Sequence, residues 1–246
     1  MSFIKTFKRK LSNINEIFSK KNYISNENII VTGANSGIGF QLVNILKDHK
    51  NDILAFVNND DENIKSIQND KIKILKCDFS TPENINNYSN DISNFKPTIL
   101  INCAASFGPN NQLIESFLTN EFNSILNINV LSPIILINNS LRSNSLKQII
   151  NISSTMGSIS KSNGNYYLYR SSKTLLNSVT KNLSYELKNK KVSIFCLHPG
   201  DVKTKMNSGG LISSKSAAQK IINICFLNKS TFHGKFIDSD GKILSW

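Results

Sequence analysis

Short apolar runs recur along the chain from residue 28 onward, and stretches with helical periodicity separate them. Seven of these runs predict strands: Ile29–Val31, Ile53–Val57, Ile72–Leu75, Ile99–Ile101, Gln148–Ile152, Val192–Leu197 and Lys235–Ile237. Three intervening stretches predict helices: Phe40–Leu46, a long one from about Asn120 to Leu141, and another from about Tyr167 to Leu187. Apolar strands that alternate with helices are typical of a parallel sheet covered on both faces. We therefore expect one α/β domain over residues 27–246 with a seven-stranded, mainly parallel sheet.

The first 26 residues have a different pattern. Apolar side chains recur there at helical spacing: Phe3, Ile4, Phe7, Leu11, Ile14, Ile17 and Phe18. Against one acid, Glu16, the same stretch carries six bases: Lys5, Lys8, Arg9, Lys10, Lys20 and Lys21. This pattern predicts a basic amphipathic N-terminal helix. Three interpretations stay open: a helix docked on the domain, a helix on an anionic membrane surface, or an organelle transit peptide.

Composition excludes several other classes of protein. The chain has 246 residues, with 39% hydrophobic and 19% charged side chains, which suits one large domain with a substantial core. Its net charge of +12 raises the question of nucleic acid, but the lysines outside the leader are scattered and no aromatic residues interleave with them. We expect no nucleic-acid binding. No stretch approaches the ~18 apolar residues that a membrane-spanning helix requires.

Cysteine and histidine usage suggests neither a disulfide framework nor a metal site. The four cysteines are widely spaced, with no Cys-x-x-Cys pair: Cys77, Cys103, Cys196 and Cys225. The three histidines are isolated from one another: His49, His198 and His233. A reducing compartment is the simple interpretation, so we expect a cytoplasmic protein, with the membrane surface or an organelle as alternatives through the leader.

A glycine-rich turn, TGANSGIG from Thr32 to Gly39, follows the first predicted strand and opens the first predicted helix. Gly33 allows a tight exit from the strand, Gly37 allows backbone to approach a pyrophosphate, and Gly39 allows the helix to pack closely on the sheet. Phosphates then lie at the helix N-terminus, where free N–H groups favour negative charge. Because the turn lies between a strand and an amphipathic helix, it predicts a dinucleotide site in a doubly wound, Rossmann-type domain.

Tyr169 and Lys173 are four residues apart in YRSSK, so a helix places them on one face. A phenol titrates near pKa ~10, and a neighbouring ammonium favours the phenolate. We therefore expect Lys173 to lower the pKa of Tyr169 toward the working range of a proton donor. The neighbouring tyrosines lack this partner, since Tyr166 and Tyr167 have Arg170 and Ser171 four residues on.

The TGxxxGIG turn together with YxxxK resembles the short-chain dehydrogenase/reductase family, and the resemblance extends over nearly all of the chain from Asn28. It implies that Ser154, which precedes Gly157 by three residues, is the catalytic serine. It also implies that Asn129 is the active-site asparagine, whose backbone carbonyl holds a water linking Lys173 to solvent. The alternative for Asn129 is a structural role beside Pro133.

The resemblance also implies a nucleotide-binding set. Asp78 corresponds to the acid that contacts adenine, Asn102–Ala105 to the family's NNAG motif, and the segment from Pro199 to Thr204 to the element that holds the nicotinamide carboxamide. The full expected set is Gly33, Asn35, Ser36, Gly37, Ile38, Gly39, Asn58, Asp78, Phe79, Asn102, Ala104, Tyr169, Lys173, Pro199, Gly200, Val202 and Thr204.

The choice between NADP and NAD depends on the end of the second strand, where a carboxylate favours NAD. Asn58 stands where NADP-preferring relatives carry arginine, and Asp60 lies too far out to decide. The resemblance to the family, rather than the chemistry of this strand end, favours NADP, with NAD as the alternative.

The C-terminal segment, together with MGSIS, YRSSK and HPGDVKTKM, resembles the sniffer/C-factor group of carbonyl reductases within that family. That group usually has tryptophan where Asp201 stands. The resemblance implies hydride transfer between NAD(P)H and a small carbonyl or alcohol substrate, with Tyr169 as proton donor or acceptor, in a homodimer or homotetramer. The alternative function is a non-catalytic dinucleotide-binding redox sensor or signalling protein on the same fold.

Overall fold

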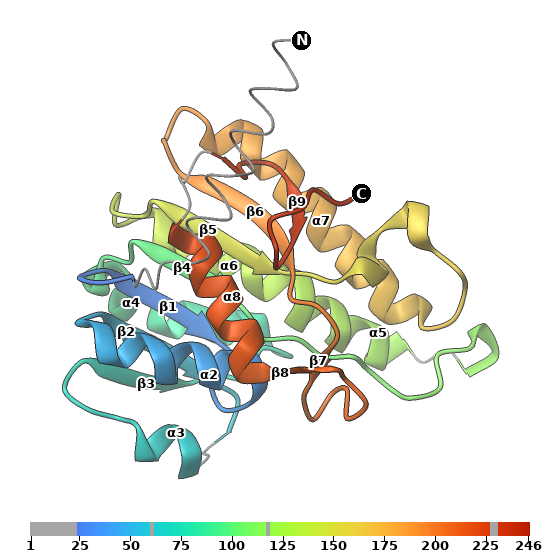
Figure 1. Cartoon of the computed structure of the whole chain (residues 1–246), viewed down its shortest axis with the longest axis horizontal. Coiled ribbons are helices and arrows are strands. Elements are labelled where there is room, and N and C mark those ends of the chain that lie inside the picture. Colours follow the sequence, from blue (N-terminus) through green and yellow to red (C-terminus); the bar gives the residue numbers. More distant parts are fainter. Residues whose placement is uncertain (1–23, 60–61, 117–118, 227–230) are drawn as a thin grey trace.

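The computed structural model describes residues 24–59, 62–116, 119–226 and 231–246. Seven strands form one sheet in the order β3-β2-β1-β4-β5-β6-β9, and every neighbouring pair is parallel (Figure 1). Their bounds are β1 Asn28–Thr32, β2 Asp52–Val57, β3 Ile72–Lys76, β4 Ile99–Asn102, β5 Gln148–Ile152, β6 Ser193–His198 and β9 Phe236–Asp238. A small second sheet pairs β7, Val202–Lys203, with β8, Ile212–Ser213.

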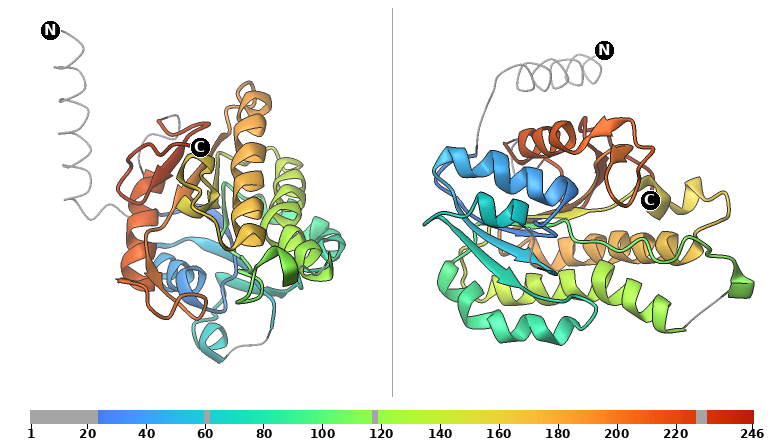
Figure 2. Two further views of the ribbon diagram at one scale, coloured as in Figure 1. Left: turned by 90° about the vertical axis from the view of Figure 1, so that its right-hand side faces the viewer. Right: turned by 90° about the horizontal axis from the view of Figure 1, so that it is seen from below.

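Helices cover both faces of the large sheet, as Figure 2 shows. One face packs on α2 (Gly37–Leu46) and α8 (Ser214–Phe226), and the other packs on α4 (Ser89–Phe95), α6 (Ser132–Leu141) and α7 (Tyr167–Leu187). The remaining helical segments are η1 Lys47–His49, α3 Glu62–Ser66, η2 Pro82–Tyr88, η3 Ile114–Ser116, α5 Thr119–Leu126, η4 Asn127–Leu131, η5 Thr155–Gly157 and η6 Ile159–Lys161.

The two cores follow from the alternation of side chains along each strand. In β1, Ile29 and Val31 point into the core under α2 and α8, whereas Ile30 points into the core under α4, α6 and α7. All three side chains are fully buried. Strands buried on both faces must be apolar at nearly every position, and this is why the sequence shows them as continuous apolar runs.

The expected doubly wound sheet and its seven strands are confirmed. One predicted helix differs in detail, because the stretch from Thr119 to Leu141 changes at Asn127–Leu131 to a π-helical segment before Pro133. The sequence-based statement on membrane spans also needs correction. This stretch is long and apolar enough to cross a bilayer by length and composition, although half of its most apolar window is buried inside the domain. The predicted leader helix lies almost wholly outside the described residues.

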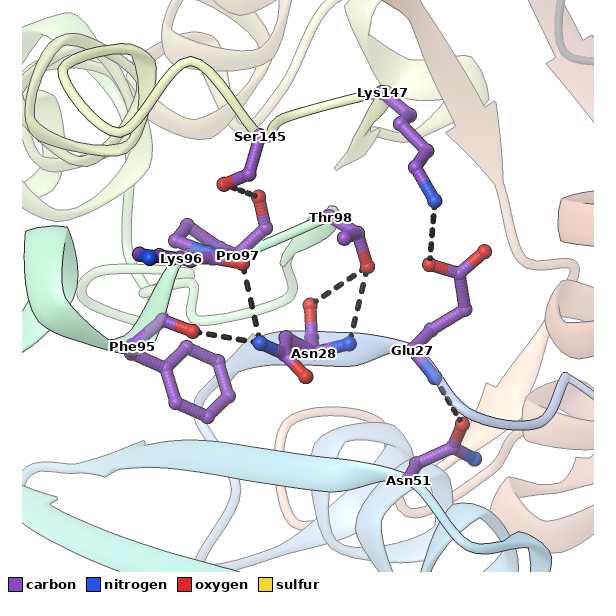
Figure 3. Close-up of polar contacts among 9 residues, drawn as sticks. All are labelled: Glu27, Asn28, Asn51, Phe95, Lys96, Pro97, Thr98, Ser145 and Lys147. Atoms are coloured by element: carbon purple, nitrogen blue, oxygen red, sulfur yellow. Dashed lines mark hydrogen bonds and ion pairs between the residues drawn. The ribbon is translucent and has the colours of Figure 1, made fainter.

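The amino ends of the strands form one edge of the sheet, where the described chain begins (Figure 3). There the backbone N–H of Asn28 donates to Thr98 Oγ1 at 3.0 Å, and the backbone N–H of Glu27 donates to Asn51 Oδ1 at 3.2 Å. Lys147 Nζ lies 3.2 Å from Glu27 Oε2. These contacts tie β1 to the segments before β2, β4 and β5. The cleft lies at the opposite edge, at the carboxyl ends of the strands.

Candidate active site

A cleft of about 1110 Å³ opens at the carboxyl ends of the strands. Its walls come from the segments that follow β1, β2, β3, β4, β5 and β6. In an open parallel sheet this edge is where ligands bind, at the point where the strand order reverses. Here the order reverses between β1 and β4, and the glycine turn after β1 lies at that point.

The glycine turn is held by contacts that only glycine allows. Gly33 has φ +66°, and a Cβ there would lie 2.9 Å from Ala104 Cα. A Cβ on Gly39 would lie 2.2 Å from the carbonyl oxygen of Gly33. Thr32 Oγ1 accepts the backbone N–H groups of Cys103 and Ala104, each at 2.9 Å. The start of α2 is therefore fixed against the segment after β4, with its N-terminal N–H groups at the cleft.

Nearly all of the expected nucleotide-binding residues line this one cleft. They are Gly33, Asn35, Ser36, Gly37, Ile38, Gly39, Asn58, Asp78, Phe79, Ala104, Tyr169, Lys173, Pro199, Gly200, Val202 and Thr204. Asn102 is the exception, because it is buried beneath the cleft and its Nδ2 donates to Asn151 Oδ1 at 2.8 Å. Asn151 in turn donates to Thr180 Oγ1 at 2.8 Å. In the described structure Asn102 joins β4 to β5 and α7 instead of lining the cleft.

Amide side chains surround the end of β2. Asn35 Nδ2 donates to Asn58 Oδ1 at 3.0 Å and to Asn59 Oδ1 at 2.8 Å. Both acceptors follow the last residue of β2, so the glycine turn and the strand end hold each other. The described residues at this strand end are uncharged amides.

Ser154, Tyr169 and Lys173 meet in the cleft although they come from two elements. Ser154 follows β5, and its Oγ accepts the backbone N–H of Met156 at 3.1 Å. The Ser154 hydroxyl also forms a hydrogen bond with Tyr169. Lys173, one turn further along α7, has its Nζ 5.8 Å from the centroid of the Tyr169 ring and donates to the carbonyl of Ile152 at 2.9 Å. The expected serine, tyrosine and lysine therefore form one cluster.

The protonation states of this cluster differ from the sequence-based expectation. Burial raises the pKa of Tyr169 to about 12, and the hydrogen bond from Ser154 acts in the opposite direction. Burial also lowers the pKa of Lys173 to about 8, although Cys103 and Cys196 act to raise it. The expectation that Lys173 lowers the pKa of Tyr169 was wrong. Loss of water around the buried phenol is the largest effect, and it raises this pKa. The phenol is held in its protonated form at neutral pH.

Asn129 lies behind the cleft, in the π-helical segment Asn127–Leu131, and is fully buried. Its Nδ2 donates to the carbonyl of Ser106 at 2.8 Å and to Ser172 Oγ at 2.9 Å, and its Oδ1 accepts the N–H of Ser106 at 2.8 Å. The side chain thus ties the segment after β4 to α7. Pro133 has no N–H to give to the carbonyl four residues earlier, which is that of Asn129.

The sequence analysis did not predict a role for two residues of the segment after β4, Phe107 and Gln112. The Phe107 ring lies against Tyr169, with 4.8 Å between centroids, and against Tyr166, with 5.1 Å. Gln112 is buried, and its Oε1 accepts the backbone N–H of Tyr169 at 3.1 Å. Its Nε2 donates to the carbonyls of Phe107 and Pro109 at 2.8 and 3.0 Å. No local spacing marks the contact between Gln112 and Tyr169, since it joins positions 57 residues apart.

Metal ligands are not gathered at the cleft. Over the described residues, no group of three or more His, Cys, Asp or Glu side chains could hold a metal ion. None of the four cysteines forms a disulfide bond. Burial, the largest effect, raises the pKa of Cys103 to about 12, so this thiol beside Lys173 is protonated.

The sequence profile of the short chain dehydrogenase family matches residues 27–210. The chain belongs to this family, which confirms the expectation from its motifs. An uncharacterized oxidoreductase of Saccharomyces cerevisiae is 27% identical, over 87% of this chain and 90% of the relative. The 3-oxoacyl-acyl-carrier-protein reductase of Rickettsia prowazekii is 29% identical, over 72% of this chain and 73% of the relative.

Solved structures show the same likeness. The carbonyl reductase Sniffer of D. melanogaster superposes with a TM-score of 0.82 at 26% identity, over 91% of this chain and all of the other. An NADPH-bound carbonyl reductase from chicken fatty liver has a TM-score of 0.81 at 23% identity, again over 91% of this chain, and this likeness shows the fold. The C-signal protein of Myxococcus xanthus is 27% identical over 108 residues. The sequence therefore resembles members of the expected group.

Proposed function

We propose that the protein is an NADP(H)-dependent carbonyl reductase in which Tyr169 protonates the carbonyl oxygen of a small substrate. One observation carries the proposal: Ser154, Tyr169 and Lys173 meet in the cleft that the glycine turn also lines. A redox sensor would need the nucleotide-binding half of this cleft. It would not need a protonated phenol, a hydroxyl and an ammonium beside it.

The residues present fit a dinucleotide. A Cβ on Gly33 or Gly39 would collide with backbone, so the turn keeps the close surface that a pyrophosphate requires. Gly37 has φ +55°, and its N–H belongs to the first turn of α2. When bound, the nicotinamide supplies the hydride, and the protein supplies position and field.

NADP is favoured because the end of β2 carries the amides of Asn58 and Asn59. Amides do not repel a 2′-phosphate as a carboxylate would. The NADPH-bound chicken carbonyl reductase supports the same choice, although another structure of this fold, a 4-hydroxyisoleucine dehydrogenase, holds NADH.

Each side chain of the cluster has a distinct task. The Ser154 hydroxyl lies beside Tyr169 and is positioned to bond the same substrate oxygen. Tyr169 holds a proton at neutral pH because burial disfavours its phenolate, so it donates only when a basic oxygen develops next to it. The Lys173 ammonium is close enough to the ring to stabilise the phenolate left behind. Asn129 braces the wall of the cleft through Ser106 and Ser172.

The experiment that tests this function is a turnover screen with the full chain. Purified protein is mixed with NADPH or NADH and a panel of aldehydes, ketones and quinones, and nucleotide oxidation is followed. We expect oxidation with at least one carbonyl and a preference for NADPH. Tight nucleotide binding without oxidation in any well would contradict the reductase and favour the sensor.

A homodimer or homotetramer is proposed on a separate observation. Large apolar side chains are exposed on the helices of one face, namely Leu131, Leu175 and Tyr185. Exposed apolar side chains of this size are typical of surfaces that pair with another copy. Light scattering coupled to size-exclusion chromatography tests this, and a single species with the mass of one chain would contradict it.

A further inference from the structure

Positive charge gathers at the edge of the sheet opposite the cleft. The segments that lead into β2, β3, β4, β5, β6 and β9 all lie at this amino edge, because all these strands are parallel. They are 47–51, 67–71, 96–98, 142–147, 188–192 and 231–235. Together they carry ten lysine or arginine residues and two carboxylates, Asp48 and Asp70. Lysines that are scattered in the sequence are therefore neighbours in the fold.

The cleft edge has no such excess. The described segments that follow the strands carry four lysines, Lys161, Lys203, Lys205 and Lys242, and four carboxylates, Asp78, Glu115, Asp201 and Asp240. Helix C-termini favour cations, and this accounts for a single lysine at a helix end. It does not account for the three lysines of 188–192, all of which are exposed.

Two regions account for the whole of the chain's net positive charge. The amino-edge segments contribute +8 and residues 1–23 contribute +5, against +12 for the whole chain. The remainder is close to neutral. Residue 24, where the described chain begins, is buried at this edge, and its carbonyl accepts Asn51 Nδ2 at 2.8 Å.

We propose that the amino edge binds an anionic phospholipid surface and leaves the cleft facing solution. Seven strands span about 30 Å, so the edge presents a broad row of cations, wider than the ~8 Å Debye length at physiological salt. Among the described contacts of this row, Lys147 forms an ion pair with Glu27 (Figure 3). The apolar residues in the leader sequence suit a lipid interface, whereas no aromatic residues suited to stacking nucleic-acid bases interleave with the edge lysines.

The test uses the full chain and vesicles of phosphatidylcholine, alone or mixed with phosphatidylserine, in a co-sedimentation assay. We expect binding to the mixed vesicles, none to phosphatidylcholine alone, and release as salt rises. The variant Lys188→Gln/Lys190→Gln/Lys235→Gln removes three exposed cations of the edge. Each lysine near an anionic surface contributes roughly fivefold in binding, so the triple variant is expected to bind on the order of 100-fold more weakly.

The matched control is Lys161→Gln/Lys203→Gln/Lys242→Gln, which makes the same change at the cleft edge. It is expected to bind the mixed vesicles within about twofold of wild type, since its lysines face away from the membrane. Equal binding by wild type and both variants would overturn the proposal. So would binding to a single-stranded oligonucleotide without binding to the mixed vesicles. Unchanged thermal unfolding of both variants shows that the comparison concerns the surface and not the fold.

Discussion

The buried side chain of Gln112 accepts the backbone N–H of Tyr169 at 3.1 Å, across 57 residues of sequence. Helix α7 begins after Tyr166, which has φ +51° and gives no side-chain cap. The first N–H groups of a helix need acceptors, and Gln112 supplies one of them. The same amide holds the carbonyl of Phe107, whose ring lies on Tyr169. The position of the tyrosine is thus set from the segment that follows β4.

Replacing Gln112 by leucine is expected to leave buried backbone groups without partners. The stability of the fold should fall by about 1–3 kcal/mol, and kcat by roughly tenfold, because Tyr169 and Phe107 lose their common anchor. Nucleotide affinity should change little. Gln219→Leu on α8, outside the cleft lining, is the matched control and should keep wild-type kcat. An unchanged kcat in Gln112→Leu would show that Gln112 does not position Tyr169.

Gly157 lies where the segment after β5, which carries Ser154, meets α7. A Cβ there would come within 2.8 Å of Lys173 backbone and Cβ atoms, so Gly157→Ala should force the two apart. Overpacking of this kind costs about 1–3 kcal/mol in the free energy of unfolding. Gly209→Ala is the control, because nothing lies within 4 Å of a Cβ at that position. Thermal unfolding of both variants checks this, and equal midpoints would contradict the packing argument.

The rate of carbonyl reduction should depend on pH through Lys173. Its pKa is lowered to about 8 by burial, so its ammonium is present below that pH and is lost above it. Tyr169, with its pKa raised to about 12, stays protonated over the same range. We expect kcat/KM for reduction to be level near neutral pH and to fall above about pH 8. In Lys173→Arg the charge persists, so the fall should move to higher pH, and a fall at the same pH would assign it to another group.

Nucleotide preference should follow the charge at Asn58. Asn58→Asp places a carboxylate where a 2′-phosphate would lie, and NADPH should bind roughly tenfold to a hundredfold more weakly, while NADH is less affected. Asn63→Asp, on α3 and outside the cleft lining, controls for added charge alone. Titration with both nucleotides measures this. Equal weakening for NADPH and NADH would place the 2′-phosphate elsewhere.

Much of the fold could be predicted because strands buried on both faces must be apolar throughout. The glycine turn and the Tyr169–Lys173 pair are also local patterns, and the structure brings both to one cleft. The contact of Gln112 with Tyr169 has no local pattern, so the sequence could not show it. The predicted direction of the Tyr169 pKa shift was wrong, because the burial of Tyr169 depends on Phe107 and other residues far away in the sequence.

The charged edge is an intermediate case. Each lysine of the segments before the strands is visible in the sequence, but only the parallel order of the sheet brings these segments to one side. Asn102 differs again, because its motif predicted a place in the cleft and its side chain instead joins Asn151. Motifs therefore located the site, and packing decided which of their members face it.

The central claim is that Tyr169 supplies the proton. Its most direct test is single-turnover reduction of a carbonyl by enzyme with NADPH already bound, comparing wild type with Tyr169→Phe and with Tyr185→Phe, an exposed tyrosine on the same helix. We predict that Tyr169→Phe binds NADPH normally but transfers hydride about 10²- to 10⁴-fold more slowly, while Tyr185→Phe keeps the wild-type rate. A Tyr169→Phe rate within twofold of wild type would contradict the account.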